Sequence, residues 1–307
     1  MPFKSLSKRV TPLALQRLVD NAVGRWKSRK FVNSRRALRS LGNVDAHWRE
    51  RIDDALACPD NASIPRVPEA GQLVDGVLTM HNGIQVGGLG YYGAGIMNML
   101  IDNCGVHEPQ EERAFGEVLK QVPPGSVMLE LGAYWAFYSL WFAQEVTDAD
   151  CYLLEPHPTN IRSGQLNFQL NQCTATFNQA YAGAVDSAAE DGIDVVTVDS
   201  HCQHRGIDRL AVLHSDIQGA EADMLRGAGR MLAAGDIDFL FISTHSNELH
   251  AECIRILQSH GYSILASADL EQTYSVDGLI VARGPRVFLP AELAISKKPR
   301  ENAVRAA

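Results

Sequence analysis

A short run of polar and small residues could hold a cofactor. It reads Glu130-Leu131-Gly132-Ala133-Tyr134, between an apolar stretch and an apolar helix. Gly132 lets the backbone pass close to a ligand, and the acid before the turn suits a ligand with an amino group and a sulfonium. The glycines that cradle a pyrophosphate in a GxGxxG loop are missing. The loop favours a nucleoside cofactor over a dinucleotide, although glycine turns of this kind also occur without a ligand.

Two further positions could complete the same site. Glu155 ends the next apolar stretch, about 23 residues after Gly132, and a carboxylate there can accept two hydrogen bonds from a ribose diol. The alternative is a surface glutamate that precedes a helix. Ala182 lies at the end of the third apolar stretch with Gly183, at the position where the adenine of such a cofactor lies. Together these residues favour an S-adenosylmethionine site.

The elements that must position these residues alternate between strand and helix. Apolar stretches that predict strands occupy residues 126–131, 151–155, 175–183, 209–216 and 238–244, with a short extra strand at 195–198. Helical patterns of ten to fifteen residues separate them, and 262–267 with 278–283 predict an antiparallel pair. This alternation predicts βαβ units and a mostly parallel sheet. Ligands bind such sheets at the carboxyl ends of the strands.

Composition excludes several protein classes. The chain has 307 residues, of which 46% are hydrophobic and 21% charged, which is ordinary for a globular protein and excludes collagen, coiled coil and full disorder. No apolar run reaches the roughly 18 residues of a membrane-spanning helix, and a secretory signal is not expected. The six cysteines lack zinc spacing. These features predict a cytoplasmic protein with reduced thiols.

Charge is concentrated at the N-terminus. Residues 1–51 hold thirteen Lys/Arg and three acids, a net charge of +10, which leaves −18 for the rest of the chain. Residues 13–26 have apolar side chains at helical spacing. Such a basic arm suits an anionic membrane surface, and the alternative is a helix that caps its own domain. The acidic body argues against nucleic acid as a partner.

The fourth predicted strand carries a specific motif. It ends in His214-Ser215-Asp216 and continues as IQGAEADMLRGA. Over roughly residues 110–283, the chain resembles the FkbM family of S-adenosylmethionine-dependent methyltransferases. At the end of the fourth strand that family has the signature KxDxEG(x)E. ELGAYWAFYSL, Glu155-Pro156 and Thr197-Val198-Asp199 match three more family motifs. The chain departs from the family at His214, Gln218 and Ala136, which replace lysine, an acid and glycine.

The resemblance implies a fold and an activity. The fold is a class I (Rossmann-like) methyltransferase fold, α/β, with a seven-stranded mostly parallel sheet whose last strand is antiparallel, plus an N-terminal helical extension. The activity is transfer of a methyl group from S-adenosylmethionine to a hydroxyl, on a sugar of a glycan or on a secondary metabolite. We expect an extension at 1–70, a substrate-side cap at 71–125, the methyltransferase domain at 126–290 and a flexible tail at 291–307.

Three residues are candidates for catalysis. Asp216 could orient the acceptor hydroxyl, act as its base or bind a divalent metal that lowers the hydroxyl pKa. His245 ends the fifth strand near the same edge, and Asp216 with His245 would be the metal ligands. His214 shares the face of Asp216 and can exchange protons near neutral pH. The alternatives are helix caps for Asp216 and His245, and a core histidine for His214.

Four residues before the cofactor strand could close over the substrate: His107, Glu108, Glu111 and Glu112. HEPQEE at 107–112 is similar to a segment that a subset of the family carries. The alternative is that these acids only complement the dipole of a helix N-terminus. Two other functions stay open: a binding protein on a catalytically degenerate fold, and a dinucleotide-dependent oxidoreductase.

Overall fold

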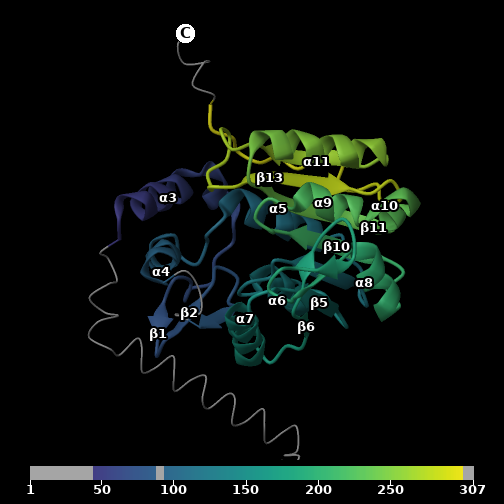
Figure 1. Ribbon diagram of the computed structural model, residues 1–307. Coiled ribbons are helices and arrows are strands. Elements are labelled where there is room, and N and C mark those ends of the chain that lie inside the picture. Colours follow the sequence, from purple (N-terminus) through teal and green to yellow (C-terminus); the bar gives the residue numbers. More distant parts are fainter. Residues whose placement is uncertain (1–43, 88–92, 300–307) are drawn as a thin grey trace, which may run out of the picture.

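A seven-stranded sheet forms the centre of the computed structural model, which describes residues 44–87 and 93–299 (Figure 1). The strands are β4 (Val127–Leu131), β5 (Asp150–Leu154), β6 (Thr176–Asn178), β10 (Leu210–Ser215), β11 (Ile237–Thr244), β12 (Ser263–Ala268) and β13 (Gly278–Arg283). Their order is β12-β13-β11-β10-β4-β5-β6. Only β13 runs antiparallel to its neighbours. This is the class I methyltransferase arrangement that the sequence predicted.

Alternate side chains of each central strand enter two separate cores. In β11, Phe239 and Phe241 belong to one buried cluster, and Leu240 and Ile242 belong to the other. The two-residue period of a strand produces this split, and a sheet covered on both faces explains the continuous apolar runs in the sequence.

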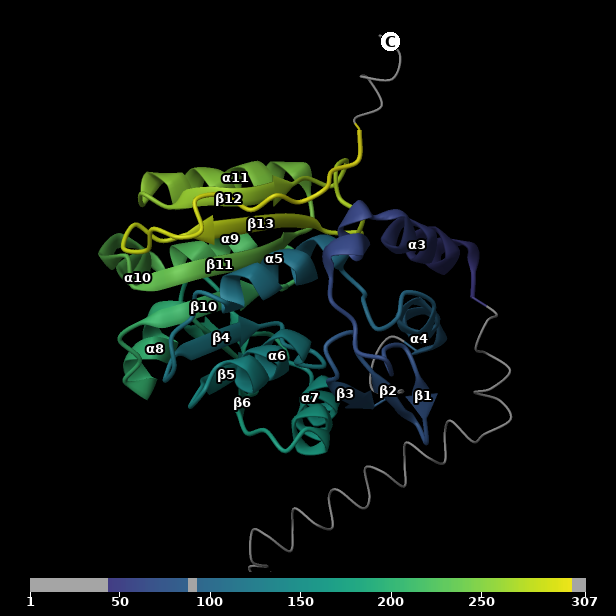
Figure 2. The same ribbon diagram turned by 180° about the vertical axis from the view of Figure 1, so that it is seen from behind.

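Helices cover both faces of the sheet (Figures 1 and 2). One core includes residues of α5 (Pro109–Leu119), α6 (Phe137–Glu145) and α7 (Pro158–Leu170). The other includes residues of α8 (Val198–Arg205), α9 (Glu221–Arg226), α10 (Gly229–Ala234) and α11 (Asn247–Ser259). β4 pairs with β5 on one side and with β10 on the other. The order in which strands are added to the sheet therefore reverses at β4, and such sheets bind ligands at this reversal.

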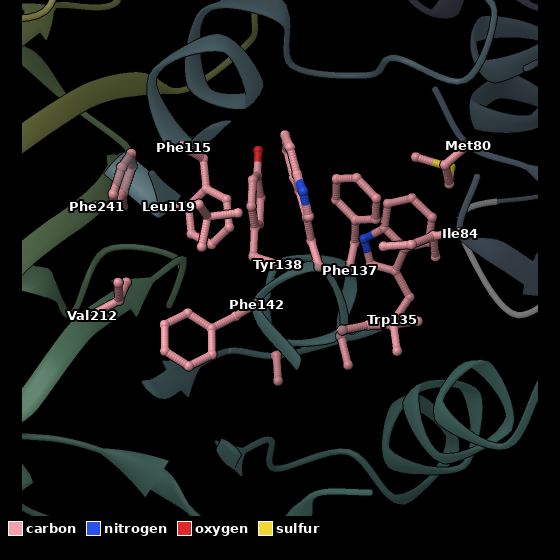
Figure 3. Packing of buried hydrophobic residues seen from close by; sticks show 14 of the residues in the cluster. Met80, Ile84, Phe115, Leu119, Trp135, Phe137, Tyr138, Phe142, Val212 and Phe241 are labelled. Atoms are coloured by element: carbon pink, nitrogen blue, oxygen red, sulfur yellow. The ribbon is translucent and has the colours of Figure 1, made fainter. Parts of the chain in front are cut away.

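Aromatic rings dock α5 against the sheet. Phe115 of α5 is fully buried, with its ring 5.0 Å from that of Tyr138 and 5.2 Å from that of Phe241. Figure 3 shows the rings of Phe115 and Tyr138 between Phe241 and Val212 on the sheet side and Met80 on the N-terminal side. The packing fixes the start of α5, which carries the predicted substrate residues, beside the carboxyl end of the sheet.

The described residues before α5, which we call the lead-in segment, form a small layer of their own. It contains α3 (Ala46–Ala57), η1 (Pro59–Ser63), α4 (Gly93–Asp102) and an antiparallel meander of β1 (Leu73–Val74), β2 (Val77–Thr79) and β3 (Gln85–Gly87). The backbone N–H groups of Gln85 and Gly87 donate to the side-chain amide oxygens of Asn171 and Asn167, at 2.9 Å each, so β3 lies beside α7 (Figure 2). The predicted basic helix at 13–26 lies outside the described residues.

Two predicted elements are divided in the structure. The stretch 175–183 forms β6 and the separate strand β7 (Tyr181–Ala182), which joins β8 (Ser187–Ala188) and β9 (Asp194–Val196) in a second small sheet. Thr197 caps α8 with its hydroxyl, so the extra strand ends before it. The helix expected after Asp216 breaks at Gly227, where a Cβ would lie 2.1 Å from the carbonyl oxygen of Gly183.

Buried charges hold α5 to the lead-in segment. Glu112 Oε1 lies 2.6 Å from His107 Nδ1, and Glu112 Oε2 lies 3.1 Å from His81 Nε2. Burial opposes charge on His107, but the carboxylates of Glu112 and Glu108 outweigh it and raise the pKa of His107 to about 10. The same histidine holds the pKa of Glu112 below its usual range, against the effect of burial.

We expect the stabilisation from His107 to disappear at high pH. A pKa raised from 6.5 to about 10 by folding means that the contribution is complete below pH 6.5 and is lost as the pH rises through 10. Urea unfolding of the wild type and of His107→Asn between pH 7 and 10 should show a stability difference that shrinks by about 1 kcal/mol per pH unit. A difference that stays constant would contradict the assignment.

Candidate active site

A cavity of about 420 Å³ opens at the carboxyl ends of β4, β5 and β10. Ten of the residues predicted from the sequence line it: His107, Glu108, Glu130, Gly132, Ala133, Tyr134, Glu155, Ala182, His214 and Asp216. The structure therefore brings the candidate cofactor residues, from three strands and the loop after β4, together with the first candidate catalytic acid.

Gly132 makes the turn over the end of β10. Its φ is +69°, and a Cβ at this position would lie 1.8 Å from the carbonyl oxygen of Asp216. The N–H of Gly132 donates to the carbonyl of Leu154 at 2.9 Å, and the N–H of Asp216 donates to that of Leu131 at 3.0 Å. Only glycine permits this approach, which puts the loop and the Asp216 backbone in direct contact.

Ala136, which stands where the family motif has glycine, has a backbone conformation that glycine adopts more readily. Its φ of 63° and ψ of 38° are left-handed, a conformation that costs alanine about 1–2 kcal/mol. The N–H of Ala136 donates to the carbonyl of Ala133 at 2.5 Å. Tyr134 also has a positive φ, of 43°. The loop therefore contains two left-handed residues that are not glycine.

Glu155 anchors the loop from the second strand. It is 3% exposed, so it is not a solvated surface residue. Its Oε2 accepts from the N–H of Tyr134 at 3.0 Å, and its Oε1 accepts from the N–H of His157 at 2.9 Å and from Asn160 Nδ2 at 3.1 Å. Oε1 already accepts two hydrogen bonds, and Oε2 accepts one, so Oε2 keeps an acceptor site for a hydroxyl in the cavity.

Asp216 belongs to a cluster of three carboxylates around His245. His245 Nε2 lies 3.3 Å from Asp216 Oδ1 and 3.4 Å from Asp277 Oδ1, and its Nδ1 lies 3.0 Å from Glu221 Oε1. Burial opposes the charge on His245, but these carboxylates outweigh it and raise its pKa to about 10. Burial and the nearby Asp216 raise the pKa of Asp277 to about 7.

His245 and Asp216 do not cap the helices that follow them, which was the alternative for both residues. Ser246 caps α11 with its side chain, and Ala220 occupies the cap of α9, so neither His245 nor Asp216 does. His245 lies behind Asp216 and is not part of the cavity wall. Sequence reasoning missed Asp277 because it precedes the last strand with no motif around it, and only the sheet order brings it to His245.

His214 is buried between two glutamates. Its Nε2 lies 2.8 Å from Glu111 Oε1, and its Nδ1 lies 4.0 Å from Glu130 Oε1. The imidazole stacks on the ring of Tyr138 with 4.3 Å between centroids. Burial opposes charge on His214, but Glu111 and Glu130 outweigh it and raise its pKa to about 8. His214 is a buried histidine whose partners are carboxylates and not the backbone.

The four residues at the start of α5 have different positions. Glu108 lines the cavity, and its Oε2 accepts from the Tyr138 hydroxyl at 3.0 Å and lies 3.3 Å from His107 Nε2. Glu111 lies behind His214, and Glu112 faces His81, away from the cavity. Tyr138 of α6 also lines the cavity. Of the four, only His107 and Glu108 border the space for a substrate.

Asp216 and His245 were also the predicted metal ligands. They contact each other directly, and among residues 44–87 and 93–299 no three His, Cys, Asp or Glu side chains are arranged to hold a metal ion. We therefore derive no step through a metal.

In the described part of the chain, no helix combines the length and the apolar character needed to cross a bilayer.

Comparison with solved structures finds distant neighbours. Precorrin-6y C5,15-methyltransferase from Geobacter metallireducens has 12% identity and a TM-score of 0.39, over 57% of this chain and 87% of its own. An rRNA methylase from Streptococcus thermophilus has 8% identity and a TM-score of 0.41, over 57% and 96%. TrmK of M. capricolum, in complex with S-adenosylhomocysteine, has 11% identity and a TM-score of 0.39, over 56% and 68%. The fold assignment itself rests on the strand order of this chain.

A family comparison identifies the domain. Curated proteins give no match to the chain. The model of the methyltransferase FkbM domain matches residues 185–264, a range that includes Asp216 and His245. The resemblance predicted from the motifs is confirmed over this range, which matches a methyltransferase FkbM domain, and the chain is a methyltransferase.

Proposed function

We propose that the protein transfers a methyl group from S-adenosylmethionine to a hydroxyl group of a sugar, in a glycan or a secondary metabolite. The observation that carries this proposal is the position of Asp216. Its carboxylate borders the cavity, its backbone contacts the Gly132 turn, and His245 holds it from behind. A base thus faces the space next to the predicted cofactor loop.

The cofactor fits the polar groups of the cavity wall. Glu155 would bind the ribose, the backbone near Ala182 would border the adenine, and the Gly132 turn would approach the methionine part. Four carboxylates line the cavity: Glu108, Glu130, Glu155 and Asp216. Their negative charge favours a ligand with a sulfonium and an ammonium group. When bound, the cofactor supplies an electrophilic methyl group.

Asp216 would orient the acceptor and remove its proton. The cofactor would supply the methyl group to the acceptor's hydroxyl oxygen, and the Asp216 carboxylate would take the hydroxyl proton. His245 Nε2, 3.3 Å from Asp216 Oδ1, would hold that carboxylate in place. Glu108, held by the Tyr138 hydroxyl, borders the acceptor space.

We expect Asp216→Asn to abolish transfer and to retain the cofactor. Loss of the proton acceptor should lower kcat by at least about 100-fold, while the Kd for S-adenosylhomocysteine changes less than tenfold. The measurement is transfer of label from methyl-labelled S-adenosylmethionine to hydroxylated sugars and to a hydroxylated metabolite extract. Unchanged turnover would reject the role of Asp216. A wild type that binds S-adenosylhomocysteine but labels no acceptor would support a non-catalytic binding protein.

Replacing Glu155 should weaken binding of the cofactor. Glu155→Ala removes the predicted ribose acceptor, and we expect a loss of about 1–3 kcal/mol in the binding free energy of S-adenosylhomocysteine, measured by titration calorimetry. Glu248→Ala is the control, because Glu248 is an exposed residue of α11. If both variants bind as tightly as the wild type, the ribose assignment is wrong.

A further inference from the structure

We propose that Glu108 selects the acceptor: its carboxylate binds a second hydroxyl group of the sugar and excludes sugars that carry a carboxylate or a phosphate at that place. This inference rests on the proposed transfer to a sugar hydroxyl, and it narrows the acceptor to an uncharged sugar. It also gives a role to the buried charges at the start of α5, which the proposed reaction does not use.

Glu108 lies at the acceptor end of the cavity. Glu155, which would hold the ribose of the cofactor, follows β5, so the acceptor would approach from the side of β10 and α5. Glu108 and Asp277 together line a small neighbouring cavity of about 10 Å³. Asp277 in turn contacts His245, the partner of Asp216. The Glu108 side chain, 17% exposed, therefore borders the same end of the cavity as Asp216.

Contacts on one side fix the Glu108 carboxylate. Its Oε2 accepts from the Tyr138 hydroxyl at 3.0 Å and lies 3.3 Å from His107 Nε2. The backbone N–H groups of His107 and Glu108 both donate to Glu112 Oε1, at 2.8 and 2.9 Å, which fixes the start of α5. Residues 44–87 and 93–299 form no hydrogen bond with Glu108 Oε1. That oxygen can accept a hydrogen bond from a ligand hydroxyl.

This end of the cavity is negative. Among the described residues that line the cavity there is no lysine or arginine. The histidines at the acceptor end already contact glutamates: His107 contacts Glu112 and Glu108, and His214 contacts Glu111. Burial opposes the charge of Glu108, but the positive His107 outweighs it and lowers the pKa of Glu108. Glu108 is therefore ionised at neutral pH.

A negative group on the acceptor would be repelled at this place. Two like charges a few Å apart repel each other more strongly in a partly buried site than in water, and like charges that meet on binding reduce affinity. An uncharged hydroxyl in the same place donates a hydrogen bond to an ionised acceptor, which is the stronger kind of hydrogen bond. Glu108 would therefore distinguish acceptors by their charge.

The test uses acceptors that differ in charge at one position. Methyl glycosides of glucose, galactose and mannose are compared with their uronates and uronamides, in which a carboxylate or an uncharged amide of similar shape replaces the primary alcohol. Label transfer from methyl-labelled S-adenosylmethionine gives kcat/KM for the wild type, Glu108→Gln and Glu117→Gln. Glu117 is the matched control, because it lies on the same helix, its side chain is 51% exposed, and it does not line the cavity.

We expect the wild type to prefer a uronamide over the matching uronate at least about 100-fold. Glu108→Gln should reduce this preference at least about tenfold, and Glu117→Gln should leave it unchanged. Because each preference is a ratio measured on one preparation, loss of folded protein does not alter it. Equal turnover of both forms by the wild type, or an unchanged preference in Glu108→Gln, would overturn the proposal. A wild type that labels none of the glycosides contradicts the sugar acceptor itself, and the inference falls with it.

A second measurement needs neither turnover nor a variant. Binding of a uronamide and of the matching uronate to the wild type is followed by NMR titration in the presence of S-adenosylhomocysteine. The uronate should bind at least about tenfold more weakly. Equal affinities would overturn the proposal even if Glu108→Gln fails to fold.

Discussion

The close approach of the Gly132 turn to Asp216 is the constraint on which the site depends. A Cβ at Gly132 would lie 1.8 Å from the Asp216 carbonyl oxygen, so the loop after β4 can pass over the end of β10 only with glycine at this position. That contact puts the residues that would bind the cofactor next to the residue that would act on the acceptor. The parallel pairing of β4 with β10 brings the two strand ends to one edge, and the turn joins them there.

Much of the fold follows from the sequence because its cause is local. The apolar stretches that end at Glu130, Glu155, Asp216 and His245 each predict a strand, and parallel strands place their carboxyl ends together. The positions where predicted elements break could not be predicted from local sequence. Gly227 ends α9 because its backbone packs against Gly183, a residue more than forty positions earlier, and no local pattern reports such a contact.

In the candidate site, too, some features follow from local sequence and others depend on tertiary packing. Residues at strand ends could be assigned from their position, whereas the partners of buried charges could not. Glu111 and Glu112 are neighbours in sequence, yet one contacts His214 on the sheet and the other contacts His81 in the lead-in segment. Consecutive positions on a helix point in different directions, so their partners depend on tertiary packing. Asp277 reaches His245 only through the pairing of β13 with β11.

Ala136 shows how little a motif position can matter to the turn that it marks. The left-handed conformation costs alanine about 1–2 kcal/mol. Its methyl group is fully buried, which returns about 0.8 kcal/mol, and alanine loses less chain entropy on folding than glycine does, by about 0.4–1 kcal/mol. These contributions nearly cancel. A sequence pattern that requires glycine at this position would therefore exclude any chain in which alanine makes the same turn at little cost.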